Sequence, residues 1–195
     1  MTDILLFHGF NINGSGIWYP WLKEQLELNG DFVVRIPDLP NAEDPILVEW
    51  LESLNEEMFG TDSTRPLIII GHSLGGYFVQ RVLESVVRDT RNFWKGRLVA
   101  VYLVAATGFP IKRVQNFYNP KLDWDKINAN TENVQFHIVW DEEDYLVSKE
   151  HGLFIHKHCN NSKLHFLNNG NNHFLENTNQ DLLQIILQNH TKQEK

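Results

Sequence analysis

The chain has 195 residues, of which 42% are hydrophobic and 22% are charged, and its formal net charge is −8 at pH 7. This length and composition favour one soluble globular domain over residues 1–195, while the negative charge argues against nucleic acid or an anionic membrane as a partner. No stretch approaches the roughly 20 apolar residues of a membrane span. Cys159 is the single cysteine and has no partner for an internal disulfide, and the first apolar run is too short for a signal peptide, so a cytoplasmic location is expected.

The first part of the chain predicts two strands and a helix between them. Residues 4–7 form a short apolar run that ends in His8-Gly9-Phe10 and a glycine-containing loop. Residues 18–28 carry apolar side chains at helical spacing, and residues 32–36 predict a second strand. Asp44-Pro45 then has the composition of an N-cap and a first helical position, followed by a predicted buried stripe. The residues of that stripe are Ile46, Trp50, Leu54 and Met58.

The segment 65–78, RPLIIIGHSLGGYF, predicts a strand, a tight turn and a helix in direct succession. Gly71-His72-Ser73-Leu74-Gly75 fits the pattern Gly-x-Ser-x-Gly of a nucleophile elbow, in which a sharp turn holds a serine in a strained backbone conformation. The pattern alone is common, but its context is specific because β-branched residues precede it and an amphipathic helix follows. Ser73 is therefore the candidate nucleophile.

The remainder of the chain continues the alternation of strands and helices. Runs at 98–105, 134–140 and 164–167 predict strands, and residues 147–159 and 177–188 predict helices. Residues 111–131 have little periodicity and several aromatic side chains, as a cap over a site would have. Short apolar strands that alternate with helices imply an α/β fold, with a parallel sheet of about six strands covered by helices on both faces. Functional groups in such sheets gather at the carboxyl ends of the strands.

A catalytic serine needs a base, and the base needs a group that orients it. Among the nine histidines, His173 follows the last predicted strand and is the expected base. The loop after Trp140 offers four carboxylates in a row, from Asp141 to Asp144. Asp144 is the expected acid, because three residues separate it from the strand and let the loop turn toward His173. The amides of Leu74 and Phe10 are the expected oxyanion hole, and His8 is expected to be structural.

These motifs resemble the α/β-hydrolase superfamily, and more closely its small YdeN-like serine hydrolases, which include retinoblastoma-binding protein nine. The resemblance is carried by the elbow, by Trp18-Tyr19-Pro20-Trp21-Leu22, by Ile36-Pro37-Asp38-Leu39-Pro40, by Trp124-Asp125-Lys126-Ile127 and by His173-Phe174-Leu175-Glu176. It implies a three-layer hydrolase fold with a minimal lid and a triad of Ser73, Asp144 and His173. Tyr145 and Asn172 depart from the usual proline and glycine of the family. The Leu-x-Cys-x-Glu element of retinoblastoma binding is absent, so that role is not carried over.

Two function classes remain: a serine hydrolase that acts on small-molecule esters, and a protein-binding module on a hydrolase scaffold with an idle site. Five aromatic residues are candidates for the walls of an acyl pocket: Phe10, Trp18, Trp21, Phe109 and Trp124, with core packing as the alternative. No cofactor is expected. The histidines at 156 and 158 diverge by about 200° around a helix and those at 151 and 158 lie two turns apart, so they do not predict a metal site. The glycine loop at 14–16 lacks the Lys-Ser/Thr of a phosphate-binding loop.

Overall fold

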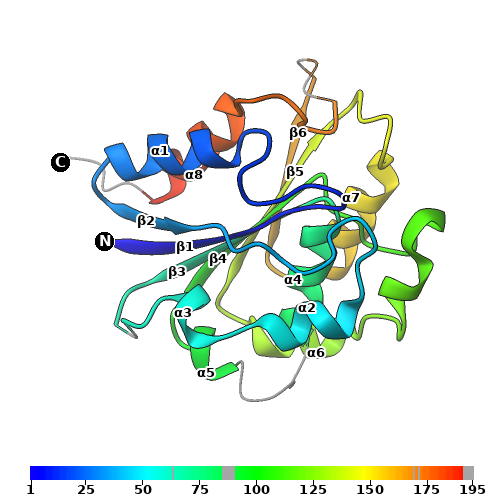
Figure 1. Ribbon diagram of the computed structural model, residues 1–195, viewed down its shortest axis with the longest axis horizontal. Helices are drawn as coiled ribbons and strands as arrows, with labels where there is room; N and C mark the ends of the chain where they lie inside the picture. Colours follow the sequence, from blue (N-terminus) through cyan, green and yellow to red (C-terminus); the bar gives the residue numbers. More distant parts are fainter. Residues whose placement is uncertain (63, 85–90, 169, 171, 191–195) are drawn as a thin grey trace.

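A computed structural model describes residues 1–62, 64–84, 91–168, 170 and 172–190. Six parallel strands form one sheet in the order β2-β1-β3-β4-β5-β6 (Figure 1). The strands are β1 (Thr2–Phe7), β2 (Phe32–Arg35), β3 (Leu67–His72), β4 (Leu98–Val104), β5 (Gln135–Asp141) and β6 (Ser162–Leu167). The predicted α/β architecture with six strands is confirmed, because each predicted apolar run overlaps one of these strands.

Helices cover both faces of the sheet (Figure 1). One face is covered by α1 (Tyr19–Leu28) and α8 (Gln180–His190), which contact each other. The other face carries α2 (Leu47–Ser53), α3 (Glu56–Phe59), α4 (Leu74–Glu84), α6 (Trp124–Asn130) and α7 (Lys149–His158). The short helix α5 (Arg91–Trp94) and the 3-10 segment η2 (Lys112–Tyr118) complete the elements. No described helix is both long and apolar enough to cross a membrane.

Two hydrophobic cores follow from the alternation of side chains along the strands. In β1, Leu5 and Phe7 belong to the core under α4, whereas Ile4 and Leu6 belong to the core under α1 and α8. All four side chains are fully buried. Successive residues of a strand point to opposite faces, so a strand covered on both sides must be apolar at every position. This requirement explains the continuous apolar runs of the sequence.

The helix predicted from Asp44 is wrong in its bounds. Ile46 has an extended backbone and α2 begins only at Leu47, so Asp44 and Pro45 lie outside the helix. The stripe also does not belong to one helix, because the backbone becomes extended at Leu54 and α3 starts anew. Asn55 explains the break, since its side chain accepts a hydrogen bond from the Met58 amide as an N-cap.

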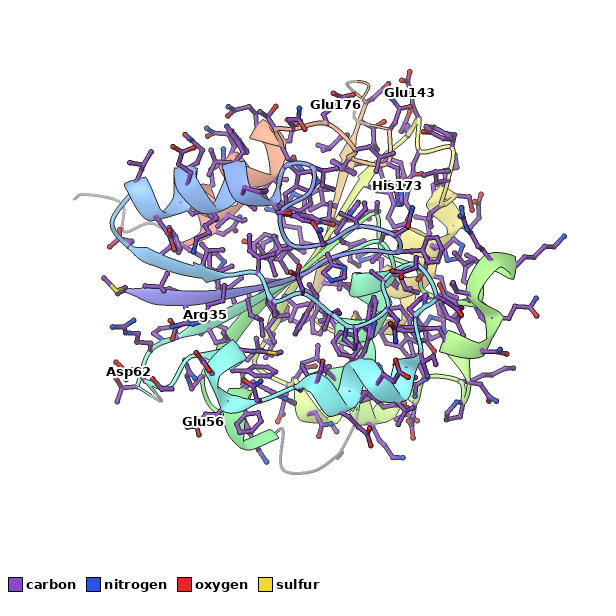
Figure 2. The ribbon with its side chains drawn as sticks, viewed as in Figure 1. Arg35, Glu56, Asp62, Glu143, His173 and Glu176 are labelled. Atoms are coloured by element: carbon purple, nitrogen blue, oxygen red, sulfur yellow. The ribbon has the colours of Figure 1, made fainter. Side chains whose placement is uncertain are left out.

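A buried ionic cluster holds the amino-terminal edge of the sheet, away from the carboxyl edge. Asp3 accepts hydrogen bonds from Arg35 and Arg97, each at 2.8 Å, and is only 1% exposed. Figure 2 shows Arg35 and Asp62 on one side of the molecule and His173 on the other. The ionic cluster around Asp3 and the candidate site at His173 therefore lie at opposite ends of the strands.

Candidate active site

Ser73 is the residue at the junction of β3 and α4, and its backbone has the strained geometry of an elbow. Its φ is +55°, in the left-handed region that side-chain-bearing residues seldom occupy. A Cβ at Gly71 would lie 2.7 Å from the Gly75 carbonyl oxygen, and a Cβ at Gly75 would lie 2.5 Å from the Phe7 carbonyl oxygen. Gly71 is therefore required where β3 turns into α4, and Gly75 is required where α4 meets the end of β1. The helical periodicity of the sequence resumes at Tyr77, but the helix itself begins three residues earlier, at Leu74.

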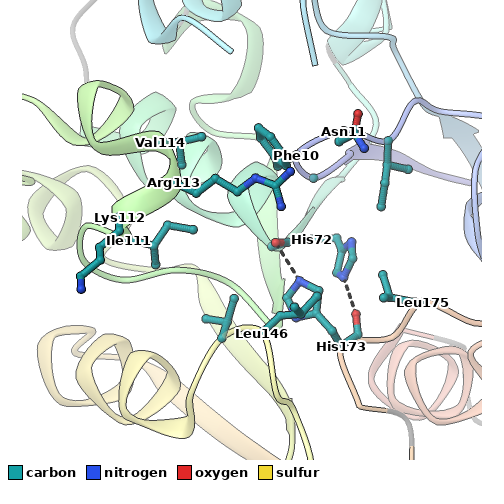
Figure 3. A pocket seen from close by; sticks show the side chains of 14 residues that line it. Phe10, Asn11, His72, Ile111, Lys112, Arg113, Val114, Leu146, His173 and Leu175 are labelled. Carbon is teal, nitrogen blue, oxygen red and sulfur yellow. Dashed lines mark hydrogen bonds between the residues drawn. The ribbon is translucent and has the colours of Figure 1, made fainter. Parts of the chain in front are cut away.

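Three side chains from separate loops meet in one hydrogen-bonded series, and Figure 3 shows the hydrogen bond of this series that His173 makes inside the pocket. The Oγ of Ser73 lies 2.9 Å from Nε2 of His173, and Nδ1 of His173 lies 2.7 Å from Oδ2 of Asp144. A carboxylate can only accept, so Nδ1 carries the proton and Nε2 of the neutral ring is free to accept from the serine hydroxyl. The three residues follow β3, β6 and β5, whose carboxyl ends lie at the same edge of the sheet.

Backbone amides hold the Asp144 carboxylate in place. Its Oδ1 accepts hydrogen bonds from the amides of Leu146 at 2.9 Å and Val147 at 2.8 Å. Oδ2 therefore stays directed at His173. Asp141 is the first of the four carboxylates from which the acid was predicted. It is fully buried at the end of β5 and accepts a hydrogen bond from the Glu143 amide at 2.9 Å. The structure thus brings Asp144 to the histidine and uses Asp141 within the loop.

The backbone on both sides of His173 is also strained. Asn172 has a φ of +50° and Phe174 a φ of +55°. Asparagine enters the left-handed region more readily than most residues, which explains how it can stand where the resemblance implies a glycine. The strained turn keeps His173 at the carboxyl edge and leaves its side chain only 5% exposed.

A second hydrogen-bonded chain, which the sequence did not predict, lies behind the first. His72 donates from Nε2 to the carbonyl oxygen of His173 at 3.0 Å, and its Nδ1 lies 2.7 Å from the hydroxyl of Tyr19. Burial, and after it the neighbouring His173, lowers the pKa of His72 to about 3, so the ring is neutral and Nδ1 accepts. Burial raises the pKa of Tyr19, which keeps its proton to donate.

This second series of hydrogen bonds ends on the loop that carries the expected oxyanion donor. The Tyr19 hydroxyl accepts from the Gly9 amide at 3.3 Å. A Cβ at Gly9 would lie 3.0 Å from Cβ of Ser73, so the loop after β1 passes directly beside the serine. Leu74 begins α4, where N–H groups have no acceptor within the helix. His8 is fully buried and accepts from the Leu39 amide at 2.8 Å, as a structural residue would.

A cavity of about 500 Å³ opens beside Ser73. Its walls come from the loop after β1, from the segment that leads into η2, from the loop before α7 and from the loop after His173. They include Phe10, Ile12, Ile111, Lys112, Arg113, Val114, Leu146, Val147 and Leu175. Residues 111–114 thus border the site, within the segment where the sequence placed a cap. The individual residues carried no signal, because they have no periodicity.

Four of the five aromatic candidates for this pocket are corrected by the structure. Trp21 packs against the core under α1 and α8. Trp18 is fully buried in the core and donates from Nε1 to the Phe174 carbonyl oxygen at 2.8 Å. Phe109 and Trp124 line a separate hollow of about 440 Å³ beside α7. Phe109 lies there because its ring stacks on the buried His151 with centroids 3.6 Å apart. Of the aromatic candidates, Phe10 alone lines the Ser73 pocket in the part of the chain that the structure describes.

The histidines of α7 have other partners. His151 accepts from the Gly108 amide, His156 contacts the Ser162 hydroxyl and His158 donates to the Phe154 carbonyl oxygen. Across the described residues, no group of three His, Cys, Asp or Glu side chains is placed to hold a metal ion.

Comparisons with known proteins agree on one family. Residues 4–156 match the model of the alpha/beta hydrolase family. YdeN of Bacillus subtilis (strain 168), which is named as a hydrolase, is 30% identical over 84 residues, so the match spans 43% of this chain and 43% of YdeN. The crystal structure of the ydeN gene product superposes with a TM-score of 0.81 at 19% identity, over 98% of this chain and 100% of that one. The predicted resemblance to YdeN is confirmed.

Esterases also share the fold. Est1E from Butyrivibrio proteoclasticus matches with a TM-score of 0.65 at 17% identity, over 96% of this chain and 84% of that one. The esterase domain of a Rhodothermus marinus protein matches with a TM-score of 0.67 at 16% identity, over 95% and 82%.

Proposed function

Since the chain belongs to the alpha/beta hydrolase family, we propose that it is a serine hydrolase that cleaves small esters through an acyl-enzyme on Ser73. The hydrogen-bonded series from Ser73 through His173 to Asp144 is the observation that carries the proposal. Such a series activates a hydroxyl that is otherwise a poor nucleophile at neutral pH. The esterase names of two structural neighbours support an ester substrate.

In the acylation step, Oγ of Ser73 bonds to the ester carbonyl carbon while its proton moves to Nε2 of His173. The bond from that carbon to the alcohol oxygen then breaks, and His173 returns the proton to the departing alcohol. Water repeats the sequence on the acyl-enzyme and releases the acid and free Ser73. Asp144 keeps the proton of His173 on Nδ1 throughout.

The tetrahedral intermediates carry negative charge on the former carbonyl oxygen. The amides of Leu74 and Phe10 are the donors proposed for it, because one begins α4 and the other follows the loop packed against Ser73. A cavity of about 500 Å³ suits a small acyl group.

A fluorophosphonate probe tests the nucleophile directly. We expect one adduct on wild-type protein, located by peptide mass mapping to Ser73, and none on Ser73→Ala. The same variant should lose turnover of 4-nitrophenyl butyrate by roughly a million-fold, as other enzymes do when a serine nucleophile is removed. Absence of an adduct on folded wild-type protein would favour the idle-site binding module instead.

A further inference from the structure

The pocket beside Ser73 has a charge opposite to that of the whole molecule. The chain carries a formal charge of −8. The described residues that line the pocket nevertheless include Lys112 and Arg113, and none of them is an aspartate or a glutamate. A cleft lined by one sign of charge concentrates ligands of the opposite sign.

Arg113 is held at the pocket by an aromatic ring. Its guanidinium lies 4.5 Å from the centroid of the Phe10 ring, at cation–π distance. Figure 3 shows the side chain of Arg113 reaching from η2 toward Phe10, whereas Lys112 points away from both Phe10 and His173. Arg113 therefore lies beside the residue whose amide is proposed to stabilise the oxyanion.

Arg113 also differs in its ion pairing from four other arginines whose side chains the structure describes. Arg35, Arg65, Arg81 and Arg97 each form an ion pair with a carboxylate. Among the described residues, no carboxylate lies within ion-pair distance of Arg113, although Asp44 borders the hollow on the other side of η2. An arginine that is fixed by a ring and lacks an acid is available to a ligand.

Apolar side chains form much of the remaining pocket lining. Ile111 and Val114 flank Arg113, and Leu146, Val147 and Leu175 form the wall beside His173. Such walls suit a chain of methylene groups, and a guanidinium at the rim suits a carboxylate, which it can bind through two parallel hydrogen bonds.

We infer that Arg113 binds a carboxylate at the far end of the acyl chain, so that the preferred substrates are monoesters of dicarboxylic acids. The inference rests on the proposed ester hydrolysis at Ser73 and names its substrate class. The acyl carbonyl would lie at Ser73, its methylene groups along the apolar wall and its free carboxylate against Arg113. Arg113 is a specificity-determining residue in this arrangement.

Matched substrates test this charge preference. The 4-nitrophenyl monoesters of glutarate, adipate and suberate each have a free carboxylate. The matched diester of each carries a methyl ester in place of that carboxylate, so the two substrates differ mainly in one negative charge. We expect Arg113→Gln to lower kcat/KM for the best monoester by about tenfold and to change its methyl diester less than twofold, because an exposed charge pair contributes modestly. Arg113→Lys should keep part of the preference, and 0.5 M NaCl should reduce it in the wild type.

The control variant is Lys95→Gln, which removes the same charge from an exposed position before β4, at the opposite edge of the sheet. This variant should leave kcat/KM unchanged for both the monoester and the diester. Equal losses on monoester and diester in Arg113→Gln would overturn the inference, because they would mean that Arg113 supports Phe10 rather than the substrate charge. A kcat/KM that stays at the wild-type value for both monoester and diester would overturn the inference as well.

A binding measurement separates this inference from the proposed chemistry. In the Ser73→Ala background, which cannot form an acyl-enzyme, calorimetry should show the best monoester binding about tenfold more weakly after Arg113→Gln is added. Equal affinities would refute the anion site whether or not the wild type hydrolyses esters. Failure of the wild type to cleave any ester or to react with fluorophosphonate would refute the hydrolase instead, and leave this binding result standing by itself.

Discussion

Asp144 and Asp141 differ in what each carboxylate oxygen accepts. Asp144 uses Oδ1 for two backbone amides and Oδ2 for His173. Asp141 accepts from the Glu143 amide inside its own loop. Four carboxylates stand in a row in this loop, and Asp144 accepts the hydrogen bond from Nδ1 of His173.

The two aspartates therefore predict different kinetics. In Asp144→Asn, the amide NH₂ that replaces Oδ2 cannot accept from His173, so the ring adopts the other tautomer and Nε2 can no longer take the serine proton. We expect kcat to fall on the order of 10⁴-fold. Asp141→Asn keeps an acceptor for Glu143 and should cost less than tenfold.

Steady-state kinetics with 4-nitrophenyl butyrate compare the two variants, with circular dichroism to confirm folding. His165→Gln serves as a further control, because His165 lies within β6 and contacts His137 rather than Ser73. A larger loss at Asp141 than at Asp144 would reverse the assignment of the acid.

At the scale of elements, Tyr19 joins α1 to both loops that flank the serine. Its hydroxyl contacts Gly9 in the loop after β1 and His72 at the end of β3, and His72 in turn holds the backbone of His173. All of these groups are buried, so a missing partner could not be replaced by water without rearrangement. The helix thereby fixes the relative positions of Ser73, His173 and the loop after β1.

Tyr19→Phe should consequently lower kcat by about tenfold or more, because small displacements of catalytic groups are costly. The KM should change less, since Tyr19 does not line the pocket. The rate of fluorophosphonate labelling should fall in parallel with kcat, which a purely structural loss of stability would not cause in the folded protein.

Tyr102→Phe is the matched control for Tyr19→Phe. Tyr102 is buried on the same face of the sheet, and within the described residues its hydroxyl has no hydrogen-bond partner. Removing that hydroxyl should leave kcat unchanged. Equal effects of the two substitutions would mean that the Tyr19 hydroxyl has no positioning role.

At the scale of the whole molecule, buried histidines couple stability to pH. Burial lowers the pKa of His72 to about 3 and those of His137 and His151 to about 4, from an ordinary value of 6.5. For His137 the neighbouring His165 adds to the effect. Below pH 6.5 the unfolded chain binds protons at these rings that the folded protein does not bind. The stabilisation is therefore complete above pH 6.5 and is lost as pH falls toward 4.

Urea denaturation between pH 7.5 and 5 measures this loss above the range in which most carboxylates titrate. Each such histidine should reduce the free energy of unfolding by about 1.4 kcal/mol per pH unit well below pH 6.5. His137→Gln should make the slope shallower by about one such contribution. His156→Gln, at an exposed position, should leave it unchanged. A free energy of unfolding that is constant from pH 7 to 5 would contradict the prediction.

The sequence by itself determined the order of strands and helices, the elbow at Ser73 and the residues that meet it. These features are local: a strand covered on both faces must be continuously apolar, and an elbow requires glycines where backbones touch. The loops that follow parallel strands then meet at one edge, which brought Ser73, Asp144 and His173 within reach of prediction. The break between α2 and α3 was missed because an apolar stripe at helical spacing continues across Asn55.

Only the tertiary structure decided the walls of the pocket and the second hydrogen-bonded chain. Whether an aromatic residue faces a cavity or a core depends on which distant elements pack against it, and spacing along the chain does not record this. Trp18 is buried against the loop of His173, where it donates a hydrogen bond to Phe174, 156 residues away in the sequence. Phe109 lies beside α7 because its ring stacks on His151. Arg113 became a candidate for substrate binding because η2 and the loop after β1, which are far apart in the chain, bring its guanidinium to Phe10.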